Sequence, residues 1–137
     1  MNRLMSSTYF MIKPEAVRGQ VFGEILHMVT RNRFRVDRLE MRTLSRQTAE
    51  EFYAEHKERP FFGELVSYMT SGPVIAIKLS GEEAQPRLRL LVGATNPADA
   101  TPGTVRYMFG ASLQENAVHA SDSPESAARE LGIIFGE

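Results

Sequence analysis

Cysteine is absent from this sequence, and so is any long apolar run. Without cysteine the chain has no disulfide framework, no thiol nucleophile and no zinc–thiolate site. A membrane helix needs about 20 consecutive apolar residues, and no run approaches that length. The N-terminal residues, MNRLM, are not followed by the apolar core of a secretory signal. We therefore expect a cytoplasmic protein with no membrane partner.

A charge excess of one sign is also lacking. Lys and Arg number 16 against 17 Asp and Glu, so the formal net charge is −1. Such a balance provides no global basic field for nucleic acid, and we expect no specific nucleic-acid partner. The 137 residues are enough to bury a hydrophobic core, and we find no internal repeat. A single domain over residues 1–137 is the expectation.

Two glycine-rich nucleotide motifs are missing as well. The sequence has neither the P-loop pattern G-x-x-x-x-G-K-(S/T) nor the dinucleotide pattern G-x-G-x-x-G. A phosphate site would therefore need side-chain donors, for which arginine is well suited because its planar guanidinium donates two parallel hydrogen bonds. The candidate donors are Lys13, Arg87, Arg89, Thr95, Thr104 and Arg106. Composition alone does not distinguish these side chains from ordinary solvated surface residues.

Apolar spacing predicts the order strand–helix–strand–helix–helix–strand–helix–strand–helix. Strands are expected at residues 8–13, 34–43, 74–79 and 117–119, and helices at residues 21–30, 45–57, 61–69, 80–92 and 124–131. The apolar parity shifts between Val36 and Leu39, which indicates a bulge. Pro14 is expected to end the first strand. The segment SGEE at residues 80–83 suggests a capping box, and residues 93–114 show no period and suggest a functional loop. The order of strands and helices favours an antiparallel sheet covered by helices.

The segment NAVHASDSPES at residues 116–126 is the most informative part of the chain. It places His119 between a short apolar run and a cluster of hydroxyls and carboxylates, with Ser123 and Pro124 suited to begin a helix. Imidazole serves nucleophilic and proton chemistry near neutral pH. The alternative is a loop histidine beside a helix cap. His27 and His56 are interpreted as structural, although His56 follows Tyr53 closely enough to lie beside a site.

Residues 116–123 resemble the signature of the nucleoside diphosphate kinase family, Asn-x-x-His-x-Ser-Asp-(Ser/Ala). Further blocks occur in the family's order and spacing, namely KP at 13–14, GE at 23–24, RPFF at 59–62, SGPV at 71–74, GATNP at 93–97, PGTVR at 102–106 and ESAARE at 125–130. The resemblance extends from about residue 8 to residue 135. It implies an α/β (α+β) fold, a ferredoxin-like sandwich with a four-stranded antiparallel sheet covered by helices.

The resemblance also implies a role for each matching side chain. It implies phosphate contacts from Arg89, Thr95 and Arg106, ribose contacts from Lys13 and Asn116, and base stacking on Phe61 with Leu65 and Leu113 nearby. It places Tyr53 close to a phosphohistidine at His119, Glu130 on the imidazole with Ser121 beside it, and Asp122 near Mg²⁺ through water. From the residues alone, Phe61 and Leu65 could equally belong to the core of a short helix.

The activity implied is transfer of the γ-phosphate of a nucleoside triphosphate to a nucleoside diphosphate, with Mg²⁺, by a ping-pong mechanism through His119. One alternative is a non-enzymatic nucleotide-binding or phosphohistidine relay protein. The presence of His119, Lys13, Arg106 and Glu130 argues against this alternative. Another is a ferredoxin-like nucleic-acid module, which the charge balance disfavours. The chain departs from the family pattern at Glu15, where Asp or Asn is usual, and also at Ala94, at Ala120 and before Phe109, positions without a direct catalytic role.

The resemblance further implies a homo-oligomer whose basic unit is a dimer formed through the sheet edge and the first helix. The given sequence ends at Glu137, only a few residues after the last predicted helix. In hexameric members a longer tail secures contacts between neighbours. We therefore expect a tetramer in preference to a hexamer.

Overall fold

The computed structural model describes residues 5–137, so part of the N-terminal segment considered above for a secretory signal lies outside the described residues. These residues contain a four-stranded sheet in the order β2-β3-β1-β4, in which all neighbouring strands are antiparallel. The strands are β1 (Met5–Ile12), β2 (Arg35–Arg42), β3 (Val74–Glu82) and β4 (Val118–Ala120). Strand order and direction confirm the predicted ferredoxin-like sandwich.

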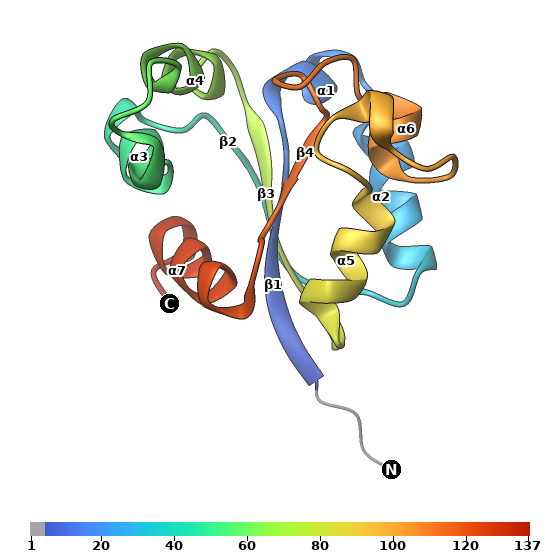
Figure 1. Cartoon of the computed structure of the whole chain (residues 1–137). Helices are drawn as coiled ribbons and strands as arrows, with labels where there is room; N and C mark the ends of the chain where they lie inside the picture. The colour runs from blue at the N-terminus through green and yellow to red at the C-terminus, as the bar shows by residue number, and fades with distance from the viewer. Residues whose placement is uncertain (1–4) are drawn as a thin grey trace.

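Helices cover both faces of the sheet (Figure 1). On one face lie α1 (Pro14–Arg18), α2 (Phe22–Arg31), α5 (Ala84–Val92) and α6 (Val105–Phe109). On the other lie α3 (Arg46–Phe52), α4 (Phe62–Met69) and α7 (Pro124–Phe135). Two short 3₁₀ turns, η1 (Ala54–His56) and η2 (Pro97–Asp99), complete the connections. None of the helices within residues 5–137 is both long enough and apolar enough to cross a membrane.

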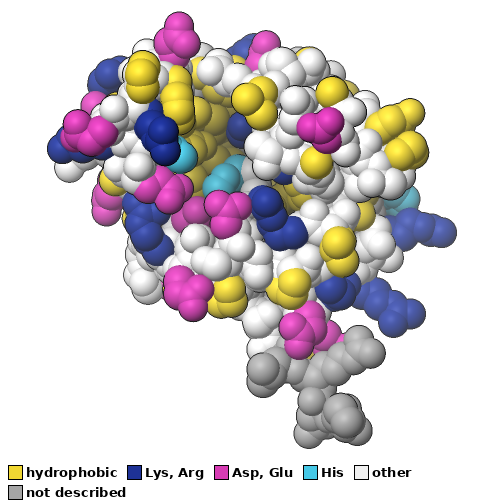
Figure 2. Space-filling view, viewed as in Figure 1, with side chains coloured by type: hydrophobic (Ala, Val, Ile, Leu, Met, Phe, Trp, Pro, Cys, Tyr) yellow, Lys and Arg dark blue, Asp and Glu magenta, His cyan; other side chains and the backbone are white. Residues whose placement is uncertain are grey.

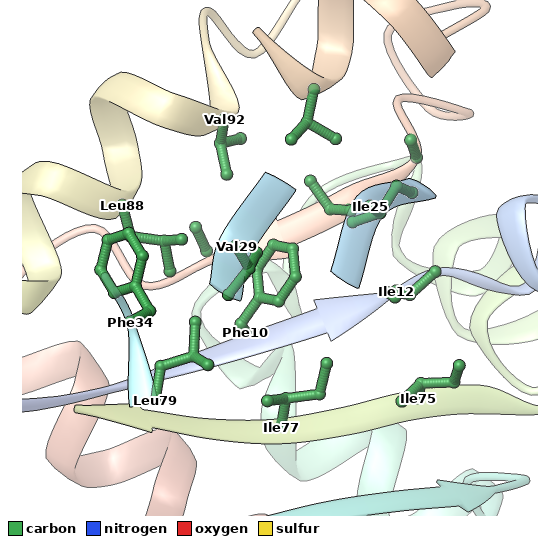
Figure 3. Packing of buried hydrophobic residues seen from close by; sticks show 14 of the residues in the cluster. Phe10, Ile12, Ile25, Val29, Phe34, Ile75, Ile77, Leu79, Leu88 and Val92 are labelled. Atoms are coloured by element: carbon green, nitrogen blue, oxygen red, sulfur yellow. The ribbon is translucent and has the colours of Figure 1, made fainter. Parts of the chain in front are cut away.

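The central strand β1 has hydrophobic cores on both of its faces. Because side chains alternate along a strand, Phe10 and Ile12 pack towards α2 and α5 (Figure 3), whereas Tyr9 and Met11 pack towards α3 and α7. All four side chains are fully buried. Full burial of a large apolar side chain contributes about 1.5–3 kcal/mol, so this strand is a rigid support for the residues at its end.

Local cap patterns predicted some helix starts correctly and one wrongly. Ser45 accepts the Thr48 N–H at 3.1 Å and Ser123 accepts the Ser126 N–H at 3.0 Å, as expected of N-caps. The predicted capping box at residues 80–83 is wrong, because residues 80–82 continue β3 and pair with residues 5–7 of β1. Helix α5 instead begins at Ala84. Strand pairing with a distant segment outweighed the local signal.

Other boundaries also differ from the prediction. Pro14 does not merely end a strand but begins α1, the expected helix 45–57 ends at Phe52, and the last helix continues to Phe135. The expected loop at residues 93–114 contains η2 and α6, the latter capped by Thr104, which accepts the Tyr107 N–H. A five-residue helix is too short to show a sequence period. The predicted bulge is confirmed by a register shift between Val36 and Arg38.

Candidate active site

A cavity of about 540 Å³ opens where the ends of β1 and β4 meet η1, α4, α5 and the loop before β4. Figure 2 shows a hollow lined by hydrophobic side chains, with histidine inside it and Lys, Arg, Asp and Glu side chains around it. The predicted site residues that line the cavity are Lys13, Tyr53, Phe61, Leu65, Arg89, Thr95, Arg106, Leu113, Asn116, His119, Asp122 and Glu130. Its size suits a small-molecule ligand such as a nucleotide.

His119 and Glu130 form the centre of the site. Pairing of β4 with β1 sets His119 opposite Met11, and the cap at Ser123 starts α7 so that Glu130 faces the strand. His119 Nε2 lies 2.9 Å from Glu130 Oε1, and both side chains are largely buried. Because a carboxylate accepts hydrogen bonds, this contact assigns the proton to Nε2 and leaves a free lone pair on Nδ1.

Among the residues to which the resemblance assigns a role, Ser121 alone does not line the cavity, and the candidate donors Arg87 and Thr104 do not line it either. Its hydroxyl is buried and lies 2.6 Å from Glu130 Oε1, to which it donates, and its backbone N–H donates to the Tyr9 carbonyl. The carboxylate oxygen that accepts the hydrogen bond from His119 Nε2 thus also accepts one from a second donor. Ser121 therefore orients Glu130 and does not contact the space where a ligand would bind.

An aromatic wall that sequence reasoning missed surrounds the imidazole. The Phe52 ring lies edge-on to His119 with centroids 5.1 Å apart, and the Tyr9 ring lies at 6.0 Å. The hydroxyl of the neighbouring Tyr53 is also buried, and burial raises the pKa of both tyrosines, which keeps these hydroxyls protonated. Alternation along β1 places Tyr9 on the same face as Met11, but nothing local indicates which helix that face meets.

Two arginines form a cationic wall opposite the aromatic one. Arg106 is buried and donates to the carbonyls of Gly93 at 3.1 Å and Val118 at 2.9 Å. Burial, assisted by the neighbouring Arg89, lowers the pKa of Arg106 to about 10, so it still carries its charge near neutral pH. Arg89 pairs with Asp122 at 3.1 Å. Buried or half-buried guanidinium groups of this kind bind anionic oxygens strongly.

Lys13 and Asn116 form the third side of the site. Lys13 Nζ donates to Asn116 Oδ1 at 2.7 Å, and Asn116 Nδ2 donates to the Thr95 carbonyl at 2.9 Å. The turn before Thr95 depends on Gly93, whose φ is +91° and whose Cβ, if present, would lie 2.6 Å from Thr104. Burial lowers the pKa of Lys13 to about 8, and the nearby Glu15 carboxylate limits the shift. Lys13 is thus a cation whose charge is lost in the mildly alkaline range.

The outer end of the cavity is apolar. The Phe61 side chain is 46% exposed and Leu113 is 63% exposed, which excludes Phe61 from the core, whereas Phe62 packs against the core cluster beneath α4. His56 also lines the cavity, with its ring 5.4 Å from that of Phe61, so it lies at the site and not in the core. His27 is exposed on α2 and does not line the cavity. Glu55 and Gln114, which sequence reasoning also missed, line the cavity together with Val118 and Ala120 of β4.

Within residues 5–137 no three metal-ligating side chains of His, Asp or Glu gather at one point. Asp122 is the carboxylate nearest the arginine wall, and its side chain is 70% exposed. A single exposed carboxylate suits Mg²⁺ that is carried mainly by substrate phosphates and water. One carboxylate does not form a binding site that holds the ion by protein ligands alone.

Comparisons with known proteins agree with this geometry. Residues 6–137 match the family model described as "Nucleoside diphosphate kinase". The nucleoside diphosphate kinase of Deinococcus radiodurans is 52% identical over 133 residues, covering 97% of this chain and 96% of that protein. That of Bdellovibrio bacteriovorus is 52% identical over 131 residues, covering 96% and 93%.

Solved structures of the same kind superpose closely. The Aquifex aeolicus nucleoside diphosphate kinase has a TM-score of 0.94 at 41% identity, covering 96% of each chain. That of Halobacterium salinarum, determined in complex with CDP, has a TM-score of 0.94 at 34% identity, covering 98% of this chain and 90% of that one. The match in sequence and in structure extends over nearly the whole chain, and this chain belongs to the nucleoside diphosphate kinase family.

Proposed function

We propose that this chain transfers the γ-phosphate of a nucleoside triphosphate to a nucleoside diphosphate with His119 as the residue that carries the phosphoryl group. The observation that carries the assignment is the 2.9 Å contact between His119 Nε2 and Glu130 Oε1. It leaves Nδ1 as the nucleophile in a cavity that also contains two arginines and a lysine. The cytoplasm, with its pool of nucleotides, is the compartment that suits this activity.

In the first half-reaction the Nδ1 lone pair attacks the γ-phosphorus in line with the bond to the β-phosphate oxygen. The P–N bond forms as that P–O bond breaks, and the nucleoside diphosphate leaves with the bonding pair. The ring then carries a positive charge, which Glu130 stabilises through the Nε2 proton. A second nucleoside diphosphate attacks the phosphohistidine and restores the neutral ring. One anhydride bond is broken and a like one is made, so the equilibrium lies near unity.

The remaining residues supply positioning and charge. Arg89, Arg106 and Thr95 bind the phosphates, since preorganised donors at the transferring group are the main source of stabilisation in phosphoryl transfer. Lys13 and Asn116 bind the ribose, and Tyr53 lies beside the phosphorylated ring. The exposed Phe61, with Leu65 and Leu113, stacks on the base. Stacking accepts purines and pyrimidines because every base has an aromatic face.

Mg²⁺ fits the site as part of the substrate. Asp122 would hold it through water, and the ion would neutralise charge on the β- and γ-phosphate oxygens. Asp122 pairs with Arg89 at 3.1 Å, so the carboxylate that would hold the ion is next to one of the arginines that would bind the phosphates.

The test of the proposal is direct labelling. Incubation with γ-labelled ATP and Mg²⁺ should place one label on the protein that is acid-labile and base-stable, as a phosphohistidine is. Peptide mapping should locate the label at His119, and addition of unlabelled nucleoside diphosphate should remove it. A label that is acid-stable, or that maps to another residue, would contradict the proposed mechanism.

The alkaline limb of activity should depend on Lys13. Because the pKa of Lys13 is lowered to about 8, its charge is present below that pH and lost above it, so kcat/KM, which reports the free enzyme, should fall as pH rises through about 8. In Lys13→Arg the guanidinium stays charged, and the limb should disappear even if the overall rate is lower. The control is Lys57→Ala, which removes an exposed lysine. A limb unchanged in Lys13→Arg would show that another group causes it.

We also propose a homo-oligomer, with a tetramer favoured over a hexamer. Strand β2 is an edge of the sheet and exposes Leu39 and Met41. Exposed apolar side chains on an edge strand are typical of a pairing surface. Light scattering should give a mass near four chains of 15.4 kDa, and Met41→Glu should lower it. A mass near six chains would contradict the tetramer, and a stable monomer would contradict the assembly altogether.

A further inference from the structure

The segment that leads into β4 has a strained backbone. Ala117 has a φ of +74°, and the Val118 N–H donates to the Asn116 carbonyl at 2.9 Å, which closes a three-residue γ-turn around Ala117. A γ-turn with positive φ at its centre is rare and strained, above all for a residue that bears a Cβ. Asn116 is the first residue of this turn and His119 directly follows its last residue, Val118, so the geometry of the turn controls the position of both.

A single side chain binds the amide of the strained residue. Glu15 Oε2 accepts the Ala117 N–H at 2.8 Å, across a sequence separation of 102 residues. The Ala117 carbonyl accepts the Lys13 N–H at 2.9 Å, so the backbone of this residue is held on both sides by the segment that follows β1. Ala117 itself is fully buried. Loss of this acceptor would leave the N–H of a buried residue without its hydrogen-bond partner, which is unfavourable.

We propose that Glu15 is a positioning residue for the reaction, which holds Ala117 in its left-handed conformation and thereby places Asn116 and His119. This inference rests on the proposed function. It also gives a role to one of the positions at which the chain departs from the family pattern, where glutamate replaces the shorter Asp or Asn that is usual. Glu15 contacts no atom that reacts and is not a cavity-lining residue.

The charge of Glu15 has a second effect, on Lys13. The charged groups that act on Lys13 are Glu15, which favours its protonated form, and Arg106, which opposes it, while its Nζ donates to Asn116 and to the Gln114 carbonyl. Glu15 in turn is acted on by Lys13 and Glu115. Removal of the Glu15 charge should therefore shift the alkaline limb of kcat/KM to lower pH. A residue with only a structural role would not move that limb.

Two variants separate the hydrogen bond from the charge. Glu15→Ala removes the acceptor and should lower kcat/KM about tenfold or more, with the loss visible in the rate of His119 phosphorylation. Glu15→Gln keeps an acceptor oxygen and should stay within about threefold of the native protein at pH 7, but its alkaline limb should move to lower pH. Glu24→Gln, at an exposed position on α2, is the matched control and should change neither quantity.

The strain itself is tested by combining Glu15→Ala with Ala117→Gly. Glycine adopts positive φ without steric cost, so the turn should keep its shape without help from Glu15. The loss caused by Glu15→Ala should shrink to about threefold or less when Ala117→Gly is also present. An equal loss in both backgrounds, or a Glu15→Ala protein with native kinetics, would overturn the proposal.

A measurement that needs no activity keeps this result apart from the proposed function. Hydrogen exchange at the Ala117 amide should be slow in the native protein and in Glu15→Gln, and at least about tenfold faster in Glu15→Ala. Absence of label on native His119 would refute the proposed function alone. Unchanged exchange in Glu15→Ala would refute the role of Glu15 alone.

Discussion

His119→Ala should abolish phosphoryl transfer. Among residues 5–137, His56 is the other histidine that lines the cavity, but it lies at the apolar outer end beside Phe61, and its carboxylate partner Glu55 is exposed. Steady-state assays with any pair of nucleotides and labelling with γ-labelled ATP should both give background values. Nucleotide binding, measured by calorimetry, should persist, since the phosphate, ribose and base contacts come from other residues such as Arg106, Lys13 and Phe61. Turnover at the native rate in a pure preparation would contradict the mechanism.

The stability of this variant needs its own control. His119 is not a free loop residue but lies on β4, in contact with Phe52 and with Glu130. Truncation leaves a small cavity and removes one donor from a buried carboxylate, which should lower the melting temperature. His119→Gln fills more of the space and offers an amide donor, so it should be folded and equally inactive. His27→Ala, at the exposed histidine of α2, should retain native activity.

Glu130→Gln should slow both half-reactions by about 10²–10⁴-fold without stopping them, as is typical when a partner in proton and charge handling is lost. The amide can still accept a hydrogen bond from His119 Nε2, so the ring stays oriented. It cannot neutralise the positive charge that develops on the ring during attack. Stopped-flow measurement of His119 phosphorylation and of its reversal should show comparable losses, because the same charged ring lies on both paths.

The comparison that isolates this effect is Glu125→Gln, an exposed glutamate in the first turn of the same helix α7. It should leave both rates unchanged. Ser121→Ala should give a smaller loss than Glu130→Gln, because it removes one donor to the Glu130 carboxylate but leaves the charge. A Glu130→Gln protein that is phosphorylated at the native rate would show that the contact with His119 is only structural.

Some features of this protein were determined by the sequence alone, because they depend on local chemistry. Three such features are the N-cap at Ser123, the bulge after Val36 and the end of helix α5 at Gly93. Each depends on side chains that are close together in the chain. The ordered motifs around Lys13 and His119, through their resemblance to the nucleoside diphosphate kinase family, predicted the fold and most of the residues that line the cavity. Such motifs are informative because phosphate binding and imidazole chemistry require particular side chains.

Only the tertiary structure decided the rest. The false capping box at residues 80–83 arose because the pairing of β3 with β1 is not visible locally. The two residues of the aromatic wall, Tyr9 and Phe52, are more than 40 positions apart in the chain, and their contact with His119 depends on how α3 packs on the sheet. The hydrogen bond from the Ala117 N–H to Glu15 joins positions 102 residues apart. Interactions of this kind leave no periodic or motif signal, because their geometry exists only once the sheet has brought distant segments together.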